Sequence, residues 1–380
     1  MHREDIIQRN NWQQKMEAIG FDFHSIDGRY WEESACYCFS VEEIDMIEQV
    51  TAELHQMCLE AIQHIIINKR YDDLAIPELF RKHIEQSWLK QEPSVYGRFD
   101  FSYDGFNAPK LLEYNADTPT SLIEASIAQW FWLEEVKPEM DQFNSIHEKL
   151  IDRWKKILSQ GWIREPLYFS CVDECQEDYS TVQYLRDTAY QAGILTSNIF
   201  IEDIGWDAFG KMFVDLEEKP IYSIFKLYPW EWMIQEEFGQ YILSNKLHII
   251  EPCWKMLLSN KGILPILWEL YPNHPNLLPA YFNSFPLNMP HVRKPLLSRE
   301  GSNISIYTSE NTLTTEGLYG SEGYVYQAYA PLPKFGDNNY PVIGAWIIGN
   351  EVAGLGIRED NSLITKNTSR FIPHYFVPKD

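Results

Sequence analysis

Cysteine is scarce in this sequence, which has only six cysteines among 380 residues. The close pairs are Cys36 with Cys38 and Cys171 with Cys175, and neither is matched by a second pair at the spacing of a zinc site. This scarcity excludes a disulfide-stabilised scaffold and indicates six reduced thiols.

Long apolar runs are also missing. No stretch reaches the roughly 18 apolar residues that a transmembrane helix needs, and Met1 to Asp5 leads into a polar segment without the apolar core of a signal peptide. The sequence has no internal repeat, low-complexity tract or flexible linker that would divide it sharply. We therefore expect a compact, soluble, cytoplasmic protein that does not work on a membrane.

Basic residues are few, with 32 lysines and arginines against 55 aspartates and glutamates and a formal net charge of -23. Such a balance argues against a nucleic acid or an anionic membrane as the main partner. A phosphate can still bind locally through magnesium and a few lysines. Cationic amines would be attracted by the negative field, although a solvated acidic surface explains the composition equally well.

Two common phosphate-binding motifs are absent, namely the P-loop pattern Gly-x4-Gly-Lys-Ser/Thr and the dinucleotide pattern Gly-x-Gly-x-x-Gly. A basic loop with glycine and serine does occur at residues 294–304. Backbone N–H groups around Gly301 are able to cover phosphates, with Lys294 and Arg299 adding positive charge. Lys261 begins an apolar helix, where a cation is unfavourable beside the helix dipole unless an anion lies next to it.

Residues 97–121 contain the most informative pattern. Polar and apolar residues alternate from Arg98 to Tyr103, Asp104-Gly105 favours a turn, and alternation resumes from Leu111 to Asn115, which predicts a β-hairpin. Alternation places Arg98 and Asp100 on one face, with Phe99, Phe101 and Tyr103 on the other, while Glu113 and Asn115 share a face of the second strand.

The polar face of this hairpin suits a hard cation. Magnesium prefers oxygen ligands and is usually held by one or two carboxylates plus substrate phosphates, so Asp100, Glu113 and Asn115 are candidate ligands. Arg98 beside them would stabilise a transferring phosphoryl group. An exposed strand face with one arginine–carboxylate pair explains the same spacing, because charged strand faces are common.

Periodicity elsewhere predicts mixed helix and sheet. Ser40 and Glu43 form a capping-box pattern before a long helix that ends near residues 68–70, and residues 121–136 and 140–160 read as two more helices. Strands and helices then alternate as an α/β unit, with strands at 167–172, 195–201 and 221–227 and helices at 179–192 and from about residue 231. Strands are expected in the last third at 324–329, 340–348, 352–358 and 362–365.

Acidic residues follow the first strand of that α/β unit. Glu174, Glu177 and Asp178 lie just beyond its carboxyl end, where α/β proteins often bind ligands. They are candidates for contact with an amine or peptide substrate, and a solvated acidic loop is the alternative. In the last third, an apolar slot edged by backbone groups near Tyr326-Gln327-Ala328-Tyr329 would suit a purine ring.

Several of these segments together resemble one family. The motifs are Gly97-Arg98-Phe99-Asp100-Phe101, Glu113-Tyr114-Asn115-Ala116-Asp117, Asn260-Lys261-Gly262 through Trp268, Lys294-Pro295 with Arg299 through Ile304, and Tyr326-Gln327. In this order and over nearly the whole chain, they resemble the synthetase domain of glutathionylspermidine synthase. The chain looks like the stand-alone bacterial members of that family, regarded as acid–amine ligases.

The resemblance implies an α+β protein with an ATP-grasp fold and a pre-ATP-grasp-like α/β portion. It implies an N-terminal helical part at 1–165 that carries the hairpin, a pre-ATP-grasp-like part at 166–255, and an ATP-grasp nucleotide-binding part at 256–380. ATP and two magnesium ions would be the cofactors. The partners would be a small-molecule or peptide carboxylate and an amine.

The resemblance also implies roles for individual residues. Arg98, Arg299 and Arg358 would be catalytic, and Asp100, Glu113 and Asn115 would hold magnesium. Residues matching the ATP-binding positions are Arg98, Phe99, Asp100, Lys261, Lys294, Glu300, Gly301, Gln327, Ala328, Tyr329, Ala330, Leu363, Ile364 and Thr365. Residues matching the substrate positions are Thr118, Thr120, Ser121, Gln176 and Glu177.

Differences from the family pattern concern the substrates. Where the family has a pair of acidic residues, this chain has Gln176-Glu177, and where the family has two serines after the magnesium motif, this chain has Thr118 and Thr120. Residues 226–231 also differ from the family pattern. The sequence therefore predicts an acid–amine ligase that forms an acyl phosphate but uses a substrate pair other than glutathione and spermidine. The other hypotheses are an ATP-binding module without ligase chemistry and a purely structural protein.

Overall fold

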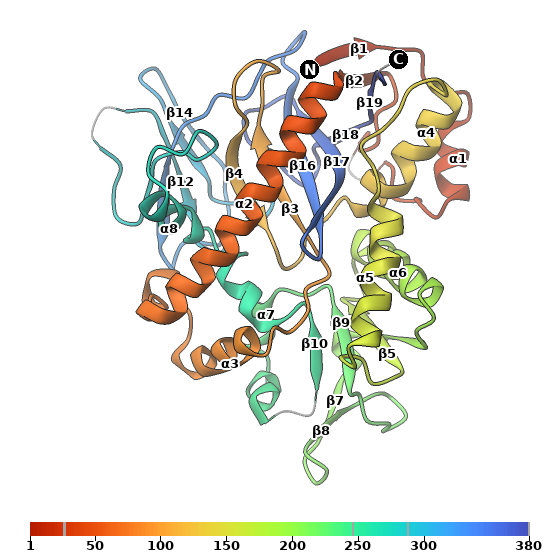
Figure 1. Ribbon diagram of the computed structural model, residues 1–380, viewed down its shortest axis with the longest axis vertical. Helices are drawn as coiled ribbons and strands as arrows, with labels where there is room; N and C mark the ends of the chain where they lie inside the picture. Colours follow the sequence, from red (N-terminus) through yellow and green to blue (C-terminus); the bar gives the residue numbers. More distant parts are fainter. Residues whose placement is uncertain (26–27, 245–246, 287–288, 379–380) are drawn as a thin grey trace.

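The computed structural model describes residues 1–25, 28–244, 247–286 and 289–378 (Figure 1). The α-helices are α1 (Trp12–Ala18), α2 (Val41–Asn68), α3 (Glu78–Leu89), α4 (Gln129–Val136), α5 (Ile146–Ser159), α6 (Gln176–Gln191), α7 (Trp230–Met233) and α8 (Ile263–Leu270). Short helical turns are η1 (Asp72–Leu74), the π-helical η2 (Glu124–Ala128), η3 (Ile201–Asp203), η4 (Gly239–Ser244) and η5 (Cys253–Leu257).

A five-stranded antiparallel sheet lies at the centre of the molecule. Its order is β18-β17-β16-β3-β4, and it joins residues that are far apart in the sequence. The strands are β3 (Tyr96–Ser102), β4 (Lys110–Asn115), β16 (Tyr340–Ile348), β17 (Glu351–Asp360) and β18 (Arg370–Ile372). The predicted hairpin is therefore the edge of a larger sheet.

The long helix α2 runs across one face of this sheet (Figure 1). The predicted capping box is present, because Ser40 accepts from the Glu43 backbone and Glu43 accepts from the Ser40 backbone. Ile62 and Leu54 on the inner side of α2 are fully buried with Phe99 and Phe101 of β3. Burial of this apolar face supplies the main stabilisation of the helix.

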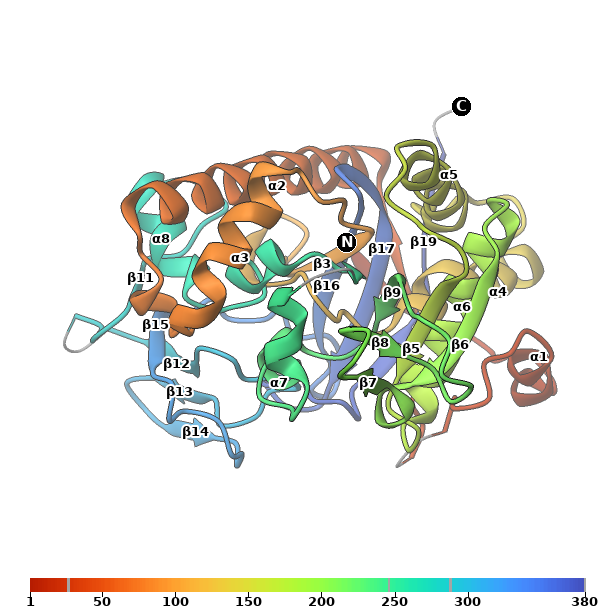
Figure 2. The same ribbon diagram turned by 90° about the horizontal axis from the view of Figure 1, so that it is seen from below.

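A parallel sheet in the order β10-β9-β5-β6 forms the α/β unit. Helices α5 and α6 pack beside it, at the right of Figure 2. A second apolar cluster joins this unit to the central sheet and contains Tyr96, Trp154, Phe169 and Trp346. The strands are β5 (Leu167–Cys171), β6 (Thr196–Phe200), β9 (Ser223–Lys226) and β10 (His248–Ile250).

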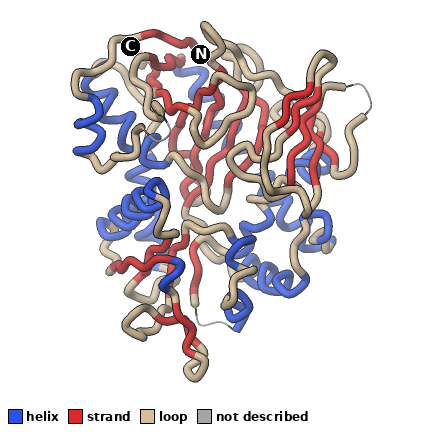
Figure 3. The backbone as a smooth tube through the Cα atoms, turned by 180° about the vertical axis from the view of Figure 1, so that it is seen from behind, coloured by secondary structure: helices blue, strands red, loops and turns tan. Residues whose placement is uncertain are grey.

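A third sheet has the order β11-β15-β12-β13-β14, and Figure 3 shows it beside the central sheet. Its strands are β11 (Ala280–Tyr281), β12 (His291–Pro295), β13 (Ser305–Tyr307), β14 (Thr312–Thr314) and β15 (Tyr324–Ala328). Two small sheets complete the fold. They contain β1 (His2–Asp5), β2 (Ala35–Phe39) and β19 (His374–Phe376), and β7 (Gly205–Asp207) and β8 (Met212–Val214).

The predicted mixture of helix and sheet is confirmed, with two local corrections. Residues 362–365 are not a strand, because Ser362 donates from its hydroxyl to Ile364 O at 2.9 Å and closes a turn instead. The helix predicted from residue 140 begins at Ile146, since the Asp141 backbone pairs with Phe376. Within the described ranges, no helix combines the length and hydropathy needed to cross a membrane.

Candidate functional site

The hairpin of β3 and β4 brings its polar side chains together in the predicted register. Arg98 lies opposite Asn115, and Asp100 lies opposite Glu113. Only 4% of Arg98 and 3% of Asp100 are exposed. The hypothesis of an exposed charged strand face is therefore wrong, because both charges are buried at the wall of a cavity.

This cavity has a volume of about 220 Å³ and lies where the hairpin, the α/β unit and the β12 sheet meet. One group of lining residues comes from the hairpin and the segment after it, and another from the basic loop and β15. The lining residues that the sequence singled out are Arg98, Asp100, Glu113, Asn115, Thr118, Thr120, Asp178, Lys261, Lys294, Arg299, Glu300, Gly301, Gln327, Ala328, Tyr329, Ala330, Arg358, Leu363, Ile364 and Thr365.

Asp100 holds two arginines at one end of the cavity. Arg98 donates from Nε to Asp100 Oδ1 at 2.6 Å and from Nη2 to Oδ2 at 3.0 Å, and Arg358 Nη2 donates to Oδ2 at 3.0 Å. Arg98 Nη1 also donates to Thr120 O at 2.5 Å. Burial alone would lower the pKa of Arg98, but the adjacent Asp100 carboxylate raises it, so the guanidinium stays charged.

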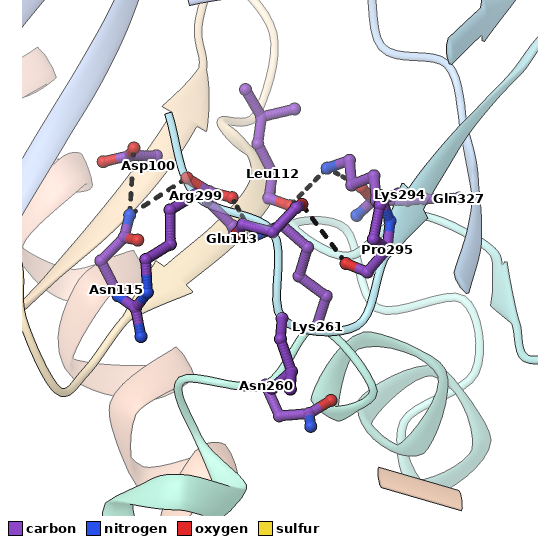
Figure 4. Close-up of polar contacts among 12 residues, drawn as sticks. Asp100, Leu112, Glu113, Asn115, Asn260, Lys261, Lys294, Pro295, Arg299 and Gln327 are labelled. Atoms are coloured by element: carbon purple, nitrogen blue, oxygen red, sulfur yellow. Dashed lines mark hydrogen bonds and ion pairs between the residues drawn. The ribbon is translucent and has the colours of Figure 1, made fainter. Parts of the chain in front are cut away.

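Two lysines, Lys261 and Lys294, lie on the Glu113 side of the cavity (Figure 4). Lys261 Nζ is 3.1 Å from Glu113 Oε2 and donates to Ser298 O at 2.6 Å, while Lys294 donates to Leu112 O at 2.8 Å and to Gln327 Oε1 at 2.7 Å. Burial favours a high pKa for Glu113, but the positive charges of Lys261 and Lys294 outweigh it and lower that pKa. The anion expected beside Lys261 is thus Glu113.

The candidate magnesium ligands meet at Asn115. Its Nδ2 donates to Asp100 Oδ2 at 3.3 Å and to Glu113 Oε1 at 3.1 Å, as Figure 4 shows. Among the described residues, no three histidine, cysteine, aspartate or glutamate side chains form a metal-binding group. The two carboxylates nevertheless fit a hard cation that completes its coordination with phosphate oxygens, and Asn115 would join them after a turn of its amide that brings the oxygen in place of Nδ2.

The loop after β12 closes one side of the cavity. Glu300 and Gly301 both have left-handed backbone conformations, with φ of 52° and 69°. A Cβ at Gly301 would lie 2.5 Å from Thr365 O, so this close approach requires glycine. Arg299 donates from Nη1 to Thr118 Oγ1 at 2.6 Å and from Nη2 to Glu231 Oε1 at 2.5 Å, which ties the loop to α7.

Apolar and backbone groups edge the opposite side. Gln327 is fixed by Lys294 and by its donation from Nε2 to Leu111 O at 3.0 Å. Ala328, Tyr329 and Ala330 follow it along the cavity wall, with Leu363, Ile364 and Thr365 as further lining. This slot can take a flat aromatic ring.

Two buried carboxylic acids, Glu124 and Glu177, and the half-buried Asp178 lie at the α6 side of the site. Burial raises the pKa of Glu124 to about 7 and, together with the charges of Glu124 and Asp178, raises the pKa of Glu177 to about 8. Burial also raises the pKa of Asp178 to about 6. Glu124 accepts from Tyr30 Oη at 2.6 Å, whereas Glu124 Oε2 and Glu177 Oε1 are buried and have no hydrogen-bond partner in the part of the chain that the structure describes.

Some expected site residues do not line the cavity. The Phe99 side chain is fully buried in the core, where it stacks on Tyr114 at 3.8 Å between ring centroids. Ser121 is 3.1 Å from Tyr30 Oη in the interior. Gln176 is exposed and donates to Asp22 at 3.2 Å, because α6 begins there and turns Glu177 and Asp178 inward instead.

Several residues of this region were not predicted as site residues. Trp232, Tyr30 and Glu124 come from segments that read as ordinary helix or loop, and Glu231 was noted only as part of the segment 226–231 that differs from the family pattern. Only the helical spacing of Ser121 and Glu124, three residues apart after the hairpin, could have suggested that Glu124 faces the same region.

Comparison with known proteins places the chain in a family. Residues 3–377 match the family model described as "Glutathionylspermidine synthase preATP-grasp". A Haemophilus influenzae protein named "Putative acid--amine ligase" is 46% identical over 392 residues, covering 99% of this chain and 98% of that protein. A trypanothione synthetase of Crithidia fasciculata is 29% identical and covers 84% of this chain, which spans about half (53%) of that longer relative.

A solved structure shares the fold at low identity. The glutathione synthetase-like effector of Globodera pallida, in its apo form, superposes with a TM-score of 0.58 at 9% identity, covering 98% of this chain and all of the other. Together with the match over residues 3–377, these findings show that the chain belongs to the glutathionylspermidine synthase family.

Proposed function

We propose that this protein is an ATP- and magnesium-dependent acid–amine ligase of the ATP-grasp type, which makes an amide through an acyl phosphate. Membership of the family already makes the chain a carbon–nitrogen ligase. The observation that carries the proposal is one cavity with four cations and two carboxylates at one end: Arg98, Lys261, Lys294 and Arg358 with Asp100 and Glu113.

These residues have complementary tasks in the proposal. Lys261 and Lys294 contact the ATP phosphates, and Arg98 and Arg358 face the phosphoryl group that is transferred. Asp100, Glu113 and Asn115 would hold magnesium, which neutralises phosphate charge when bound. Glu300 and Gly301 cover the phosphates, and the slot from Gln327 to Ala330, with Leu363 to Thr365, takes the adenine.

The proposed reaction has two steps. An oxygen of the substrate carboxylate attacks the γ-phosphorus of ATP, the bond to the β-phosphate oxygen breaks, and an acyl phosphate and ADP form. The nitrogen of a neutral amine then attacks the acyl carbon, the bond from that carbon to the phosphate oxygen breaks, and the amide forms as the nitrogen loses a proton to the departing phosphate. The loop at Arg299 excludes water while the acyl phosphate exists.

We assign the substrates to the side of the cavity near α6. Thr118, Thr120 and Asp178 line it directly, whereas Glu177 and Ser121 are buried outside the lining, with Ser121 in contact with Tyr30. Asp178 takes the place that Gln176 was expected to fill. The parts at 1–165, 166–255 and 256–380 remain our proposed division of the chain.

Replacement of single charges tests this function. Asp100→Asn and Arg98→Ala should each lower ATP turnover by about 100-fold or more, because Arg98 faces the transferring group and Asp100 would hold the magnesium and orients Arg98. Asp187→Asn changes an exposed aspartate and serves as the matched control. Turnover is measured as ADP release with paired candidate acids and amines, and undiminished turnover in both variants contradicts the assignment.

The ATP-binding module makes a different prediction. It would bind ATP with magnesium, seen as a raised melting temperature, but would release no additional ADP with any acid–amine pair. A ligase responds only when both the acid and the amine are present.

A further inference from the structure

The charge of Arg299 is already compensated before any substrate binds. Its guanidinium donates to Glu231 Oε1 from Nη2 at 2.5 Å and from Nε at 3.1 Å, and Thr118 Oγ1 accepts from Nη1. Glu231 is 7% exposed. Glu231 therefore lies in a region of low dielectric, where its charge depends strongly on Arg299, although 23% of the Arg299 side chain is exposed.

Contacts of the preceding residue, Trp230, hold Glu231 in place. It follows Trp230, whose N–H donates to Asp117 Oδ2 at 2.9 Å, and Lys226 donates to Asp117 Oδ1 at 2.6 Å. Lys226 and Asp117 are almost fully buried. Because α7 is anchored on these contacts, the Glu231 carboxylate is presented to Arg299 as a fixed group.

The remaining ionisable groups on this side of the cavity are acidic. Asp178 and Glu300 line it, and Glu177 lies behind them. Asp178 is influenced by the charges of both Glu300 and Arg299. With Arg299 matched by Glu231, the other cation that acts on Glu177 is Arg358, whose charge is compensated by Asp100.

We infer that Glu231 is a specificity-determining residue that makes this enzyme reject acids with a second negative charge. Resting on the proposed ligase function, this inference narrows the acid substrate to a class. The carboxylate of the substrate acid that is activated lies at the end of the cavity where Lys261 and Lys294 contact the ATP phosphates. The other end of the substrate acid is neutral or cationic. The apolar wall of Leu227, Pro229 and Trp232 suits such a group.

Three acids of equal length test the inference: pentanoate, glutarate and 5-aminopentanoate, whose far ends are neutral, anionic and cationic. Binding of each is measured by calorimetry to the full chain loaded with magnesium and a non-hydrolysable ATP analogue. In the wild type, 5-aminopentanoate and pentanoate should bind more tightly than glutarate. In Glu231→Gln, which frees the Arg299 charge, glutarate should bind about tenfold more tightly than in the wild type.

Two further variants isolate the cause. Glu236→Gln removes an exposed carboxylate nearby and should leave the order of the acids unchanged. Glu231→Gln combined with Arg299→Gln should lose the gain for glutarate. The inference is overturned if the wild type binds glutarate most tightly, if it binds the three acids with equal affinity, or if it binds none of them.

Binding of the ATP analogue separates the inference about Glu231 from the proposed ligase function. Loss of magnesium-dependent analogue binding would contradict the proposed function itself. Retained analogue binding with an unchanged affinity for glutarate in Glu231→Gln would contradict only the role of Glu231, and the melting temperature shows whether each variant is folded.

Discussion

Glu177 links the buried acidic side of the cavity to folding stability. Its pKa is about 8 because of burial and the neighbouring carboxylates, well above the usual value near 4.3. Between about pH 4.5 and 8 the folded protein keeps a proton that the unfolded chain releases, so the free energy of unfolding falls as pH rises through this window.

Glu177→Gln should therefore stabilise the protein at pH 8 by at least about 1 kcal/mol relative to the wild type, with little difference near pH 4.5. Urea denaturation at both pH values measures the change. Glu174→Gln, at an exposed position, is the control. An equal effect of Glu177→Gln at both pH values would contradict the raised pKa.

Gly344 leaves the space that Arg98 occupies. A Cβ at residue 344 would lie 2.8 Å from Arg98 Cδ, on the strand next to β3. Gly344→Ala should displace the guanidinium and lower ATP turnover by about 100-fold, and it should cost about 1–3 kcal/mol of stability. Turnover and urea denaturation are compared for each variant, and normal turnover would show that Arg98 is not needed in this position.

Residues of the site differ in how well the sequence predicted them. Strand alternation, which is a local rule, placed four polar side chains on the faces of the hairpin where the structure has them: Arg98, Asp100, Glu113 and Asn115. Glu231 could not be placed this way, because its importance comes from Arg299, 68 positions later. A long-range ion pair has no signature in the local pattern.

At the scale of elements, one buried ion pair fixes the end of the hairpin to the α/β unit. Lys226 of β9 donates to Asp117, two residues after β4. Lys226→Met would leave the Asp117 charge buried without its partner, and we expect a loss of about 3–5 kcal/mol in the free energy of unfolding.

Urea denaturation measures this loss. Lys219→Met, which removes an exposed lysine that pairs with Glu217 on the surface, should change stability little. Similar effects of both substitutions would mean that the buried pair is not a structural link.

Elements with strong local signals were predicted well. The capping box and the apolar spacing predicted α2, and the alternation of strands and helices predicted the α/β unit that contains the parallel sheet. Residues 362–365 were misassigned because β-branched residues favour a strand, while the Ser362 side chain stabilises a turn. Pairing of β3 with β16 was not predicted, since about 240 residues separate them.

At the scale of the whole molecule, the two apolar clusters share the central sheet. Phe99 and Ala345 belong to one cluster, and Tyr96 and Trp346 of the same strands belong to the other. Because neither cluster can lose its contacts without disturbing β3 and β16, we expect one cooperative unfolding transition.

Tryptophan fluorescence and far-ultraviolet circular dichroism should report the same midpoint in urea. Two separated transitions would instead indicate that the α/β unit unfolds independently of the central sheet.

Strand order in the sheet of β1, β2 and β19 brings the two ends of the fold together. β1 is antiparallel to β2 and β19 is parallel to it, with His2 opposite Cys38 and Phe376 opposite Phe39. The first strand therefore starts, and the last one finishes, at the same end of this sheet, on either side of β2 and two strand spacings or roughly 10 Å apart. A short peptide could join these ends and the chain could be reopened at the β7–β8 turn, giving a permuted protein with the cavity intact.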